Sequence, residues 1–428
     1  MLGGAIEPLL KADSNNKIRD NTMKQDGNMI GIEGVDNFDN LDGGLSHLRA
    51  IACVLSYYGE KVDWDWLMGM SGEAFCYYYH PDGTFLSQSV HSWDVAGAAL
   101  GAYGYAGKWR FEPSDDTTPA LTTIESEIAH GRLVIAPGIM PSPDGMGSRC
   151  HYWFVVTGMD RKAQKVRLLG AEEREVEASL PFGDSDKSSR HPRWYGIVRS
   201  FEGIDGHYGP AGADNPVLLI ERMGQSVEQK DLLLKSLRRG VSLAREASTS
   251  CSFGYGAGTY LSGHTAVQRL RDDLLAAKGD GLDEYERLNK PKGDPFRGLG
   301  DELAFLELLL WRRRSAADFL TQAAPLLPEA TRPHLASASN HFEDSAAEAM
   351  KAFDIRYGSE QAQIHELIRE GKYDEDHPEW IAYWKQADEA LASRNKRKAM
   401  ADHVARVLES EKAAITEMEK ALAVEAMK

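Results

Sequence analysis

The sequence predicts an α+β fold, in which helices and strands occupy separate stretches of the chain. Amphipathic segments closed by glycines indicate helices as far as residue 131. Short apolar runs between charged or glycine-bearing turns then indicate a mostly antiparallel sheet as far as residue 224. Beyond residue 225, apolar residues recur every three or four positions, which is typical of helices.

The length of 428 residues fits two or three domains. We expect a loose N-terminal arm over residues 1–30, an α+β domain over residues 31–224 and an α-helical domain over residues 225–428. The formal charge of −16 argues against a general nucleic-acid binder, which would need a broad basic face. No apolar run is long enough to span a bilayer, and the first residues do not resemble a secretory signal.

Four separated cysteines without a CxxC pair weaken both a structural zinc site and a disulfide framework, and they favour a reducing cytoplasm. No spacing of His, Cys or acidic residues supports a metal, and the glycine-rich segment near Gly254 does not follow the dinucleotide-binding pattern. We therefore expect a cytoplasmic protein that needs no metal or other cofactor and binds neither nucleic acid nor membrane.

Glycines, prolines and apolar spacing define the individual elements. A first strand is expected over residues 29–35, and an amphipathic helix opens at Ser46. Further helices are expected over residues 64–72, from Ser89 and from Thr118 to Gly131, and further strands over residues 133–138, 151–160, 165–170, 193–201 and 216–224. Helices are expected in the second part over residues 227–247, 262–277 and 301–327 and from Pro378 onward.

Two residues point to nucleophilic chemistry. Ser46 stands at the first turn of its helix after two glycines, where the partial positive charge of a helix N-terminus favours an anionic nucleophile. Serine is also among the commonest helix caps, so both interpretations stay open. His151 opens a strand after a glycine-bearing loop, where it could serve as a base or be an edge histidine with a satisfied hydrogen bond.

The motifs SHLRAIACVLSYYG and MGMSGEAF, and the strand HYWFVVTGMD, resemble the butirosin-biosynthesis acyltransferase family. RWYGIVRSF, LLIERMG, SGHTAVQRL and RRRSAADFLTQAA agree as well, so the resemblance covers about residues 30 to 350. This family belongs to the papain-like cysteine-peptidase clan and is related to bacteriocin-leader peptidases. The resemblance implies a papain-like domain, with a helical lobe and an antiparallel sheet, followed by a mostly α-helical region.

The family's activity implies transfer of an acyl or aminoacyl group from a carrier thioester to a small amine acceptor in secondary-metabolite biosynthesis. The implied partners are an acyl carrier protein, or a peptide substrate, and the amine acceptor. The basic runs at residues 312–314 and 393–398 are typical of solvated helix faces, and they could instead dock an acidic carrier protein.

The chain departs from the family at the nucleophile, because position 46 is Ser where the family has Cys. Serine is the poorer nucleophile, so this change, whether natural or engineered, is expected to weaken or disable the cysteine mechanism. Cys53 is no substitute, since it lies two turns into the helix among apolar neighbours. Alternatives are therefore a binding module that has lost its nucleophile, an amide hydrolase of the cysteine-peptidase type, or a helical interaction protein.

The remaining site residues are less sharply indicated. Papain-like sites orient the histidine with a carboxylate or amide on the next strand, for which Glu172 is the nearest candidate. Glu172 could equally be solvated like the glutamates beside it. An oxyanion donor should precede the nucleophile, where Asn40 offers an amide, although Asn40 is also a natural turn former in DNLDGG.

Overall fold

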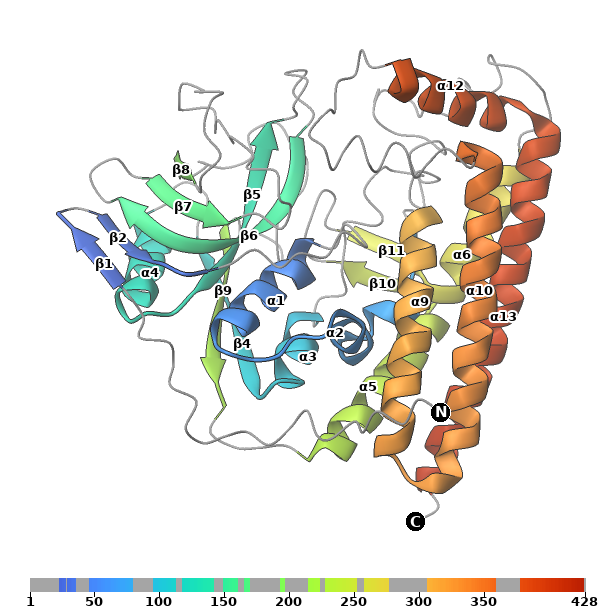
Figure 1. Cartoon of the computed structure of the whole chain (residues 1–428), viewed down its shortest axis with the longest axis horizontal. Coiled ribbons are helices and arrows are strands. Elements are labelled where there is room, and N and C mark those ends of the chain that lie inside the picture. The colour runs from blue at the N-terminus through green and yellow to red at the C-terminus, as the bar shows by residue number, and fades with distance from the viewer. Residues whose placement is uncertain are drawn as a thin grey trace, which may run out of the picture.

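The computed structural model has an antiparallel sheet and a stack of long helices, and most of the short helices lie between the two (Figure 1). This arrangement confirms the α+β class, the antiparallel sheet and the helical C-terminal region. The structure describes residues 23–27, 29–35, 46–79, 95–112, 118–141, 149–160, 165–169, 193–196, 215–223, 228–251, 258–276, 306–358 and 378–426.

The main sheet has eight strands among the described residues, all paired antiparallel. Its central path of paired strands runs in the order β1-β2-β6-β5-β9-β4. Off this path, β7 pairs with β6 and β8 pairs with β7. The strands are β1 (Met23–Asp26), β2 (Met29–Ile32), β4 (Tyr105–Glu112), β5 (Val134–Pro141), β6 (Arg149–Asp160), β7 (Lys165–Leu169), β8 (Arg193–Gly196) and β9 (Asn215–Arg222).

Strand β6 is the centre of this sheet. One of its edges pairs first with β5 and then with β2, and the other edge pairs with β7. Val155, for example, lies opposite both Ile135 of β5 and Leu169 of β7. Within the arm predicted over residues 1–30, residues 23–26 form β1, which pairs with β2 and so joins this sheet.

In the described part of the chain, four short helices accompany the sheet, and they include the predicted ones. They are α1 (Ser46–Tyr57), α2 (Trp64–Ser71), α3 (Val95–Gly101) and α4 (Thr118–Ala129), with a 3-10 turn, η1, at Glu73–Phe75. Helix α2 begins where the Asp63 carboxylate accepts a 2.8 Å hydrogen bond from the Trp66 backbone N–H. It ends at Gly72, whose φ of 83° is the left-handed conformation that favours glycine.

The second part of the chain is a helical stack with a small sheet beside it (Figure 1). Its helices are α5 (Gln229–Arg245), α6 (Gly263–Ala276), α9 (Leu306–Ala323), α10 (Arg332–Tyr357), α12 (Pro378–Ala392) and α13 (Arg394–Ala426), with 3-10 turns η2 (Ala324–Leu326) and η3 (Glu329–Thr331). The small antiparallel sheet has the order β10-β11-β3, formed by β10 (Ser248–Cys251), β11 (Gly258–Ser262) and β3 (Tyr78–Tyr79).

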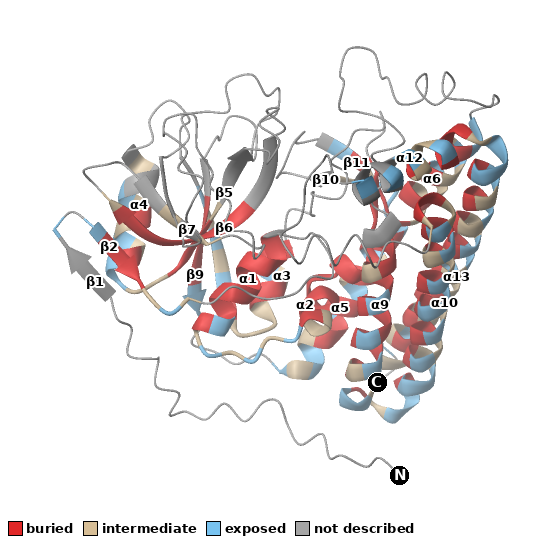
Figure 2. Ribbon diagram, turned by 45° about the horizontal axis from the view of Figure 1, so that its top comes forward, coloured by how far each residue is buried: buried red, intermediate tan, exposed pale blue. Residues whose placement is uncertain are grey.

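Both parts of the chain contribute to one hydrophobic core. A single cluster of buried side chains contains Ile51 of α1, Leu218 of β9, Phe319 of α9 and Ile415 of α13. Buried residues follow α1, the middle of the sheet and the facing sides of the long helices (Figure 2). The boundary near residue 225 therefore stays a prediction. No helix in the described ranges is both long and apolar enough to cross a membrane.

Glu348 joins α10 to α13 at the edge of this stack. Its carboxylate accepts hydrogen bonds from Arg406 Nε at 2.6 Å and from Lys351 Nζ at 2.5 Å, and it lies 2.7 Å from His403 Nδ1. Partial burial alone would raise the pKa of Glu348, but these partners outweigh it and lower the pKa from 4.5 to about 2.

A carboxyl group with a lowered folded-state pKa stabilises the fold above its ordinary pKa and loses that contribution as it is protonated. We therefore expect the free energy of unfolding to fall as the pH is lowered from about 5 toward about 2. Urea unfolding at several pH values checks this, with Glu348→Gln as the comparison. An unchanged pH slope in Glu348→Gln would contradict the assignment.

Candidate functional site

The first turn of α1 is packed against the start of β6 by three aromatic rings. The His47 ring is fully buried, and its centroid lies 4.5 Å from that of Trp153 in β6 and 5.8 Å from that of Trp109 in β4. The two indoles are themselves 5.4 Å apart in an edge-to-face arrangement. We call these three residues, His47, Trp109 and Trp153, the aromatic cluster.

The aromatic cluster also shows that the sheet is curled around α1. Strands β4 and β6 are separated by β5 and β9, which in a flat sheet would place them about 14 Å apart at the usual strand spacing. The contact between Trp109 and Trp153 requires the sheet to curve toward the helix. Helix α1 therefore lies on the concave face.

The other end of α1 fixes its direction. The Tyr58 hydroxyl accepts a 3.2 Å hydrogen bond from the Leu133 backbone N–H, just before β5, and the Tyr58 ring stacks on Tyr105 at 5.5 Å. Burial raises the pKa of Tyr58 to about 12, so this hydroxyl keeps its proton at neutral pH. Because β5 and β6 are antiparallel, α1 and β6 both start at the same end of the sheet.

This geometry bears directly on two of the four predicted site residues. Ser46 is the first residue of α1, and His151 is the third residue of β6, paired with Ile139. Alternate residues of a strand share a face, so position 151 lies on the same face as Trp153, which contacts His47. The fold thus brings positions 46 and 151 to one end and one face of the sheet. Asn40 and Glu172 lie outside the described residues.

The electrostatics of the helix start suit a nucleophile. The first turn of α1 carries no acidic side chain, so its partial positive charge is not offset by a carboxylate of that turn. Cys53 is only 1% exposed within the same helix, which agrees with its exclusion as a substitute nucleophile. Among the described residues, no group of three His, Cys, Asp or Glu side chains is arranged to hold a metal ion.

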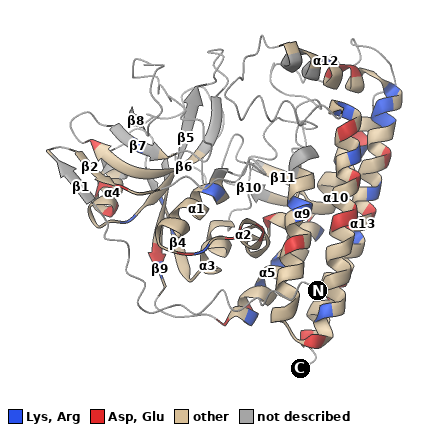
Figure 3. Cartoon of the chain, viewed as in Figure 1, with Lys and Arg blue, Asp and Glu red and all other residues tan. Residues whose placement is uncertain are grey.

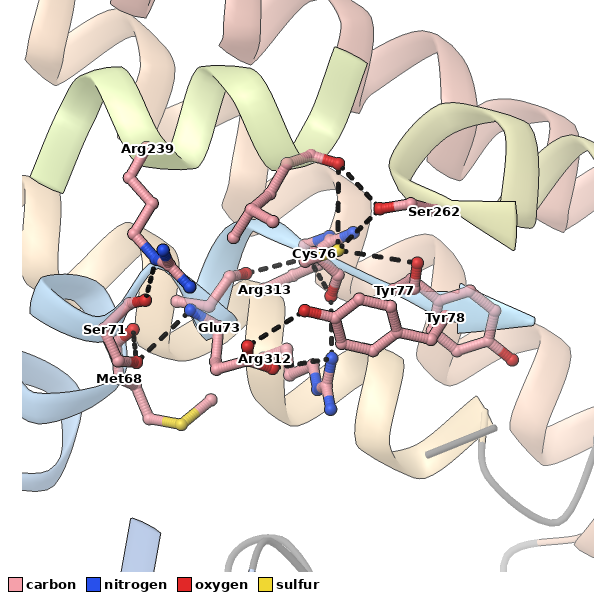
Figure 4. Close-up of polar contacts among 12 residues, drawn as sticks. Met68, Ser71, Glu73, Cys76, Tyr77, Tyr78, Arg239, Ser262, Arg312 and Arg313 are labelled. Atoms are coloured by element: carbon pink, nitrogen blue, oxygen red, sulfur yellow. Dashed lines mark hydrogen bonds and ion pairs between the residues drawn. The ribbon is translucent and has the colours of Figure 1, made fainter. Parts of the chain in front are cut away.

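A second cluster of ionisable residues joins the segment after α2 to the long helices, and Figure 4 shows the polar contacts of its members Glu73, Arg312 and Arg313. Arg313 Nε donates to Glu411 Oε1 at 2.6 Å, and Arg313 Nη1 donates to the carbonyl oxygen of Ala74 at 2.8 Å. Arg312 Nη1 donates to the Cys76 carbonyl oxygen at 3.1 Å and lies 3.6 Å from Glu73 Oε2. The four side chains of this buried ion cluster, Glu73, Arg312, Arg313 and Glu411, are at most 2% exposed.

The buried ion cluster corrects the expectation that residues 312–314 form a solvated or carrier-docking face. Arg312 and Arg313 are enclosed, and of the three arginines only Arg314 is exposed, with its guanidinium 4.8 Å from the Trp311 ring centroid. Two positive and two negative groups balance each other, and backbone carbonyls take further donors. Such an enclosed and balanced set holds segments together and offers no accessible group for catalysis.

Cys76, beside this cluster, is also structural. Its sulfur lies 3.3 Å from Ser262 Oγ, and Ser262 Oγ donates to the Leu243 carbonyl oxygen at 3.0 Å. Burial, followed by the charge of Glu73, raises the pKa of the Cys76 thiol. A thiol kept protonated and enclosed is a poor nucleophile.

The second basic run, residues 393–398, also contains one buried arginine beside exposed neighbours. Arg397 is 1% exposed and donates to the carbonyl oxygens of Leu391 and Ala392, where it caps the end of α12. Its neighbours Lys396 and Lys398 are exposed, as expected for a solvated face. Basic and acidic residues are interspersed along α10 and α13 (Figure 3), a distribution that does not single out a uniformly basic docking face there.

Comparison with known proteins leaves the site to be interpreted from its geometry, because the chain matches no protein-family model and no curated protein.

Proposed function

We propose that the chain carries a papain-like acyl-transfer site, with residue 46 as nucleophile and His151 as base. Its reaction would move an acyl or aminoacyl group from a carrier thioester to a small amine acceptor. The observation that carries the proposal is the 4.5 Å contact between the rings of His47 and Trp153. This contact joins the residue after position 46 to the residue two positions after 151.

The proposed reaction has two halves. The Ser46 hydroxyl oxygen attacks the thioester carbonyl carbon while His151 takes the hydroxyl proton, and the carbon–sulfur bond breaks as the imidazolium returns that proton to the leaving thiolate. The amine then attacks the acyl ester, its proton passes through His151 to the serine oxygen, and the carbon–oxygen bond to residue 46 breaks. The amide is released and the enzyme is restored.

Two supporting roles follow from the resemblance. The Asn40 amide and the backbone N–H groups at the start of α1 would stabilise the oxyanion of each tetrahedral intermediate. Glu172 would orient His151 through the second ring nitrogen. With an amide as the acyl donor and water in place of the amine acceptor, the same site would be an amide hydrolase.

The serine at position 46 favours a second candidate, a binding module on the same fold that has lost its nucleophile. Without a cysteine, catalysis would depend entirely on His151 taking the proton in the transition state, since serine is not ionised at neutral pH. The two candidates differ in whether position 46 is electrostatically coupled to position 151.

The test is the rate at which iodoacetamide alkylates a Ser46→Cys variant, measured from pH 5 to pH 9. A thiolate–imidazolium pair is expected to give rapid labelling well below the ordinary thiol pKa of about 8.5. The Ser46→Cys/His151→Ala variant should lose this low-pH labelling. Peptide mass spectrometry separates position 46 from Cys53, Cys76, Cys150 and Cys251.

Slow labelling that follows an ordinary thiol titration and ignores His151 would show that Ser46 is a helix cap. The catalytic proposal would then be abandoned in favour of the binding module. A fast reaction in both variants would mean that the helix N-terminus activates the thiol without His151, which contradicts the assigned base.

A further inference from the structure

We infer that His47 is a positioning residue, whose buried ring sets the distance between position 46 and position 151. This inference rests on the proposed function and concerns a residue to which the family resemblance assigns no role. His47 does not act as the base itself, because its ring is 0% exposed and is enclosed between two indoles.

The aromatic cluster lies directly beside the nucleophile position on α1. His47 is the second residue of the helix, so its backbone is covalently continuous with residue 46. Its ring contacts Trp153, which follows His151 by two residues on the same strand face. Residue 46 is therefore the chain neighbour of His47, and residue 151 lies two positions before Trp153, the ring that His47 contacts.

Trp109 restrains the orientation of the His47 ring as well as its position. It comes from β4, at the far end of the sheet path from β6, and it touches both of the other rings. The His47 ring is therefore held from two strands, which restrains the first turn of α1 against rotation as well as translation. Leu55, another buried side chain of α1, packs in the core about 12 Å further along the helix axis.

We expect small displacements of the first turn of α1 to reduce the reaction rate more than a loss of overall stability would. A misplacement of about 1 Å in a catalytic pair can cost roughly 100-fold in rate. Replacing His47 by alanine removes the ring and lets the first turn of α1 shift, whereas phenylalanine keeps a planar ring of similar size between the indoles.

The experiment compares iodoacetamide labelling of position 46 across pH in four variants. These are Ser46→Cys alone and Ser46→Cys combined with His47→Ala, with His47→Phe or with Leu55→Ala. We expect His47→Ala to slow labelling at pH 6 by at least about tenfold and to move the pH midpoint toward the ordinary thiol value of about 8.5. The phenylalanine variant should retain the low midpoint.

Leu55→Ala is the control for destabilisation alone. It removes a fully buried side chain from the same helix without touching the aromatic cluster, so it should lower the melting temperature and leave the pH midpoint unchanged. If His47→Ala does not fold, Ser46→Cys/Trp109→Leu replaces it, since Trp109 is only partly buried and its loss should shift the midpoint in the same direction.

An unshifted midpoint in His47→Ala, beside a low midpoint in Ser46→Cys, would overturn the positioning role and leave the proposed function intact. A shift of equal size in Leu55→Ala would also overturn it, because the effect would then come from general loosening. An ordinary midpoint in Ser46→Cys itself would overturn the proposed function and this inference together.

Discussion

Replacing Arg313 by alanine is expected to lower the free energy of unfolding by about 3–5 kcal/mol, because it leaves the Glu411 carboxylate buried without its cation. Glu411 is 2% exposed and lies 2.6 Å from Arg313 Nε. The same substitution removes the donor to the Ala74 carbonyl oxygen at 2.8 Å and one of the two arginine donors to the Cys76 carbonyl oxygen, at 3.3 Å. Through these hydrogen bonds Arg313 ties α9 to α13 and to the segment that contains η1.

Urea unfolding followed by circular dichroism measures this effect. Arg314→Ala is the matched control, since Arg314 is the exposed neighbour in the same helix and its contact with Trp311 should contribute no more than about 1 kcal/mol. The double variant Arg313→Met/Glu411→Met should lose less than Arg313→Ala, because neither charge is left unpaired. Equal losses in Arg313→Ala and Arg314→Ala would contradict the structural role of the buried ion cluster.

Replacing Gly263 by alanine is the second substitution expected to be severe. Gly263 joins β11 to α6 with a φ of 51°, and its backbone N–H donates to the Tyr77 carbonyl oxygen at 2.9 Å. A Cβ at this position would lie 2.2 Å from the Ala244 carbonyl oxygen, which is backbone of the last turn of α5. The strain of a non-glycine residue and the overpacking each cost about 1–3 kcal/mol, so a loss of several kcal/mol is expected.

Gly97→Ala is the control for this substitution. Gly97 lies within α3, where an added methyl group would meet no neighbouring side chain or strand within 4 Å. The better helix propensity of alanine should raise the free energy of unfolding by about 0.5–1 kcal/mol. Thermal unfolding of both variants gives the comparison. If the melting temperature of Gly263→Ala stayed close to that of the wild type, α5 and α6 would be able to separate there.

Local sequence patterns are sufficient for most elements of the sheet. The expected strand at residues 165–170 corresponds to β7 (Lys165–Leu169), and the one at residues 216–224 corresponds to β9 (Asn215–Arg222). Strand β4 is not among the predicted strands, because its first residues resemble the glycine-rich end of a helix. Its alternation is nevertheless readable, with Tyr105 and Trp109 turned inward and Lys108 and Arg110 exposed.

The small sheet β10-β11-β3 is not predicted from the sequence, for a different reason. Strand β3 has only two residues, and its partner β11 lies far along the chain, with Leu261 opposite Tyr79. Neither segment is long enough for a period of two to be recognised. The glycines around residue 254 carry a signal for a turn, and the strands that flank it, β10 and β11, pair with each other.

Local sequence is enough to set where α2 begins and ends, because an aspartate cap and a glycine in the left-handed conformation act within a few residues of each other. It also indicates two residues for a site, Ser46 and His151, through their places at the start of a helix and of a strand. The enclosure of Arg313 beside an exposed Arg314 emerges only from the folded chain, since the partner carboxylate Glu411 is 98 residues away. The placement of α1 beside β6 also emerges only from the folded chain. The ring contacts join segments about a hundred residues apart, and they produce no repeating pattern in the sequence of either segment.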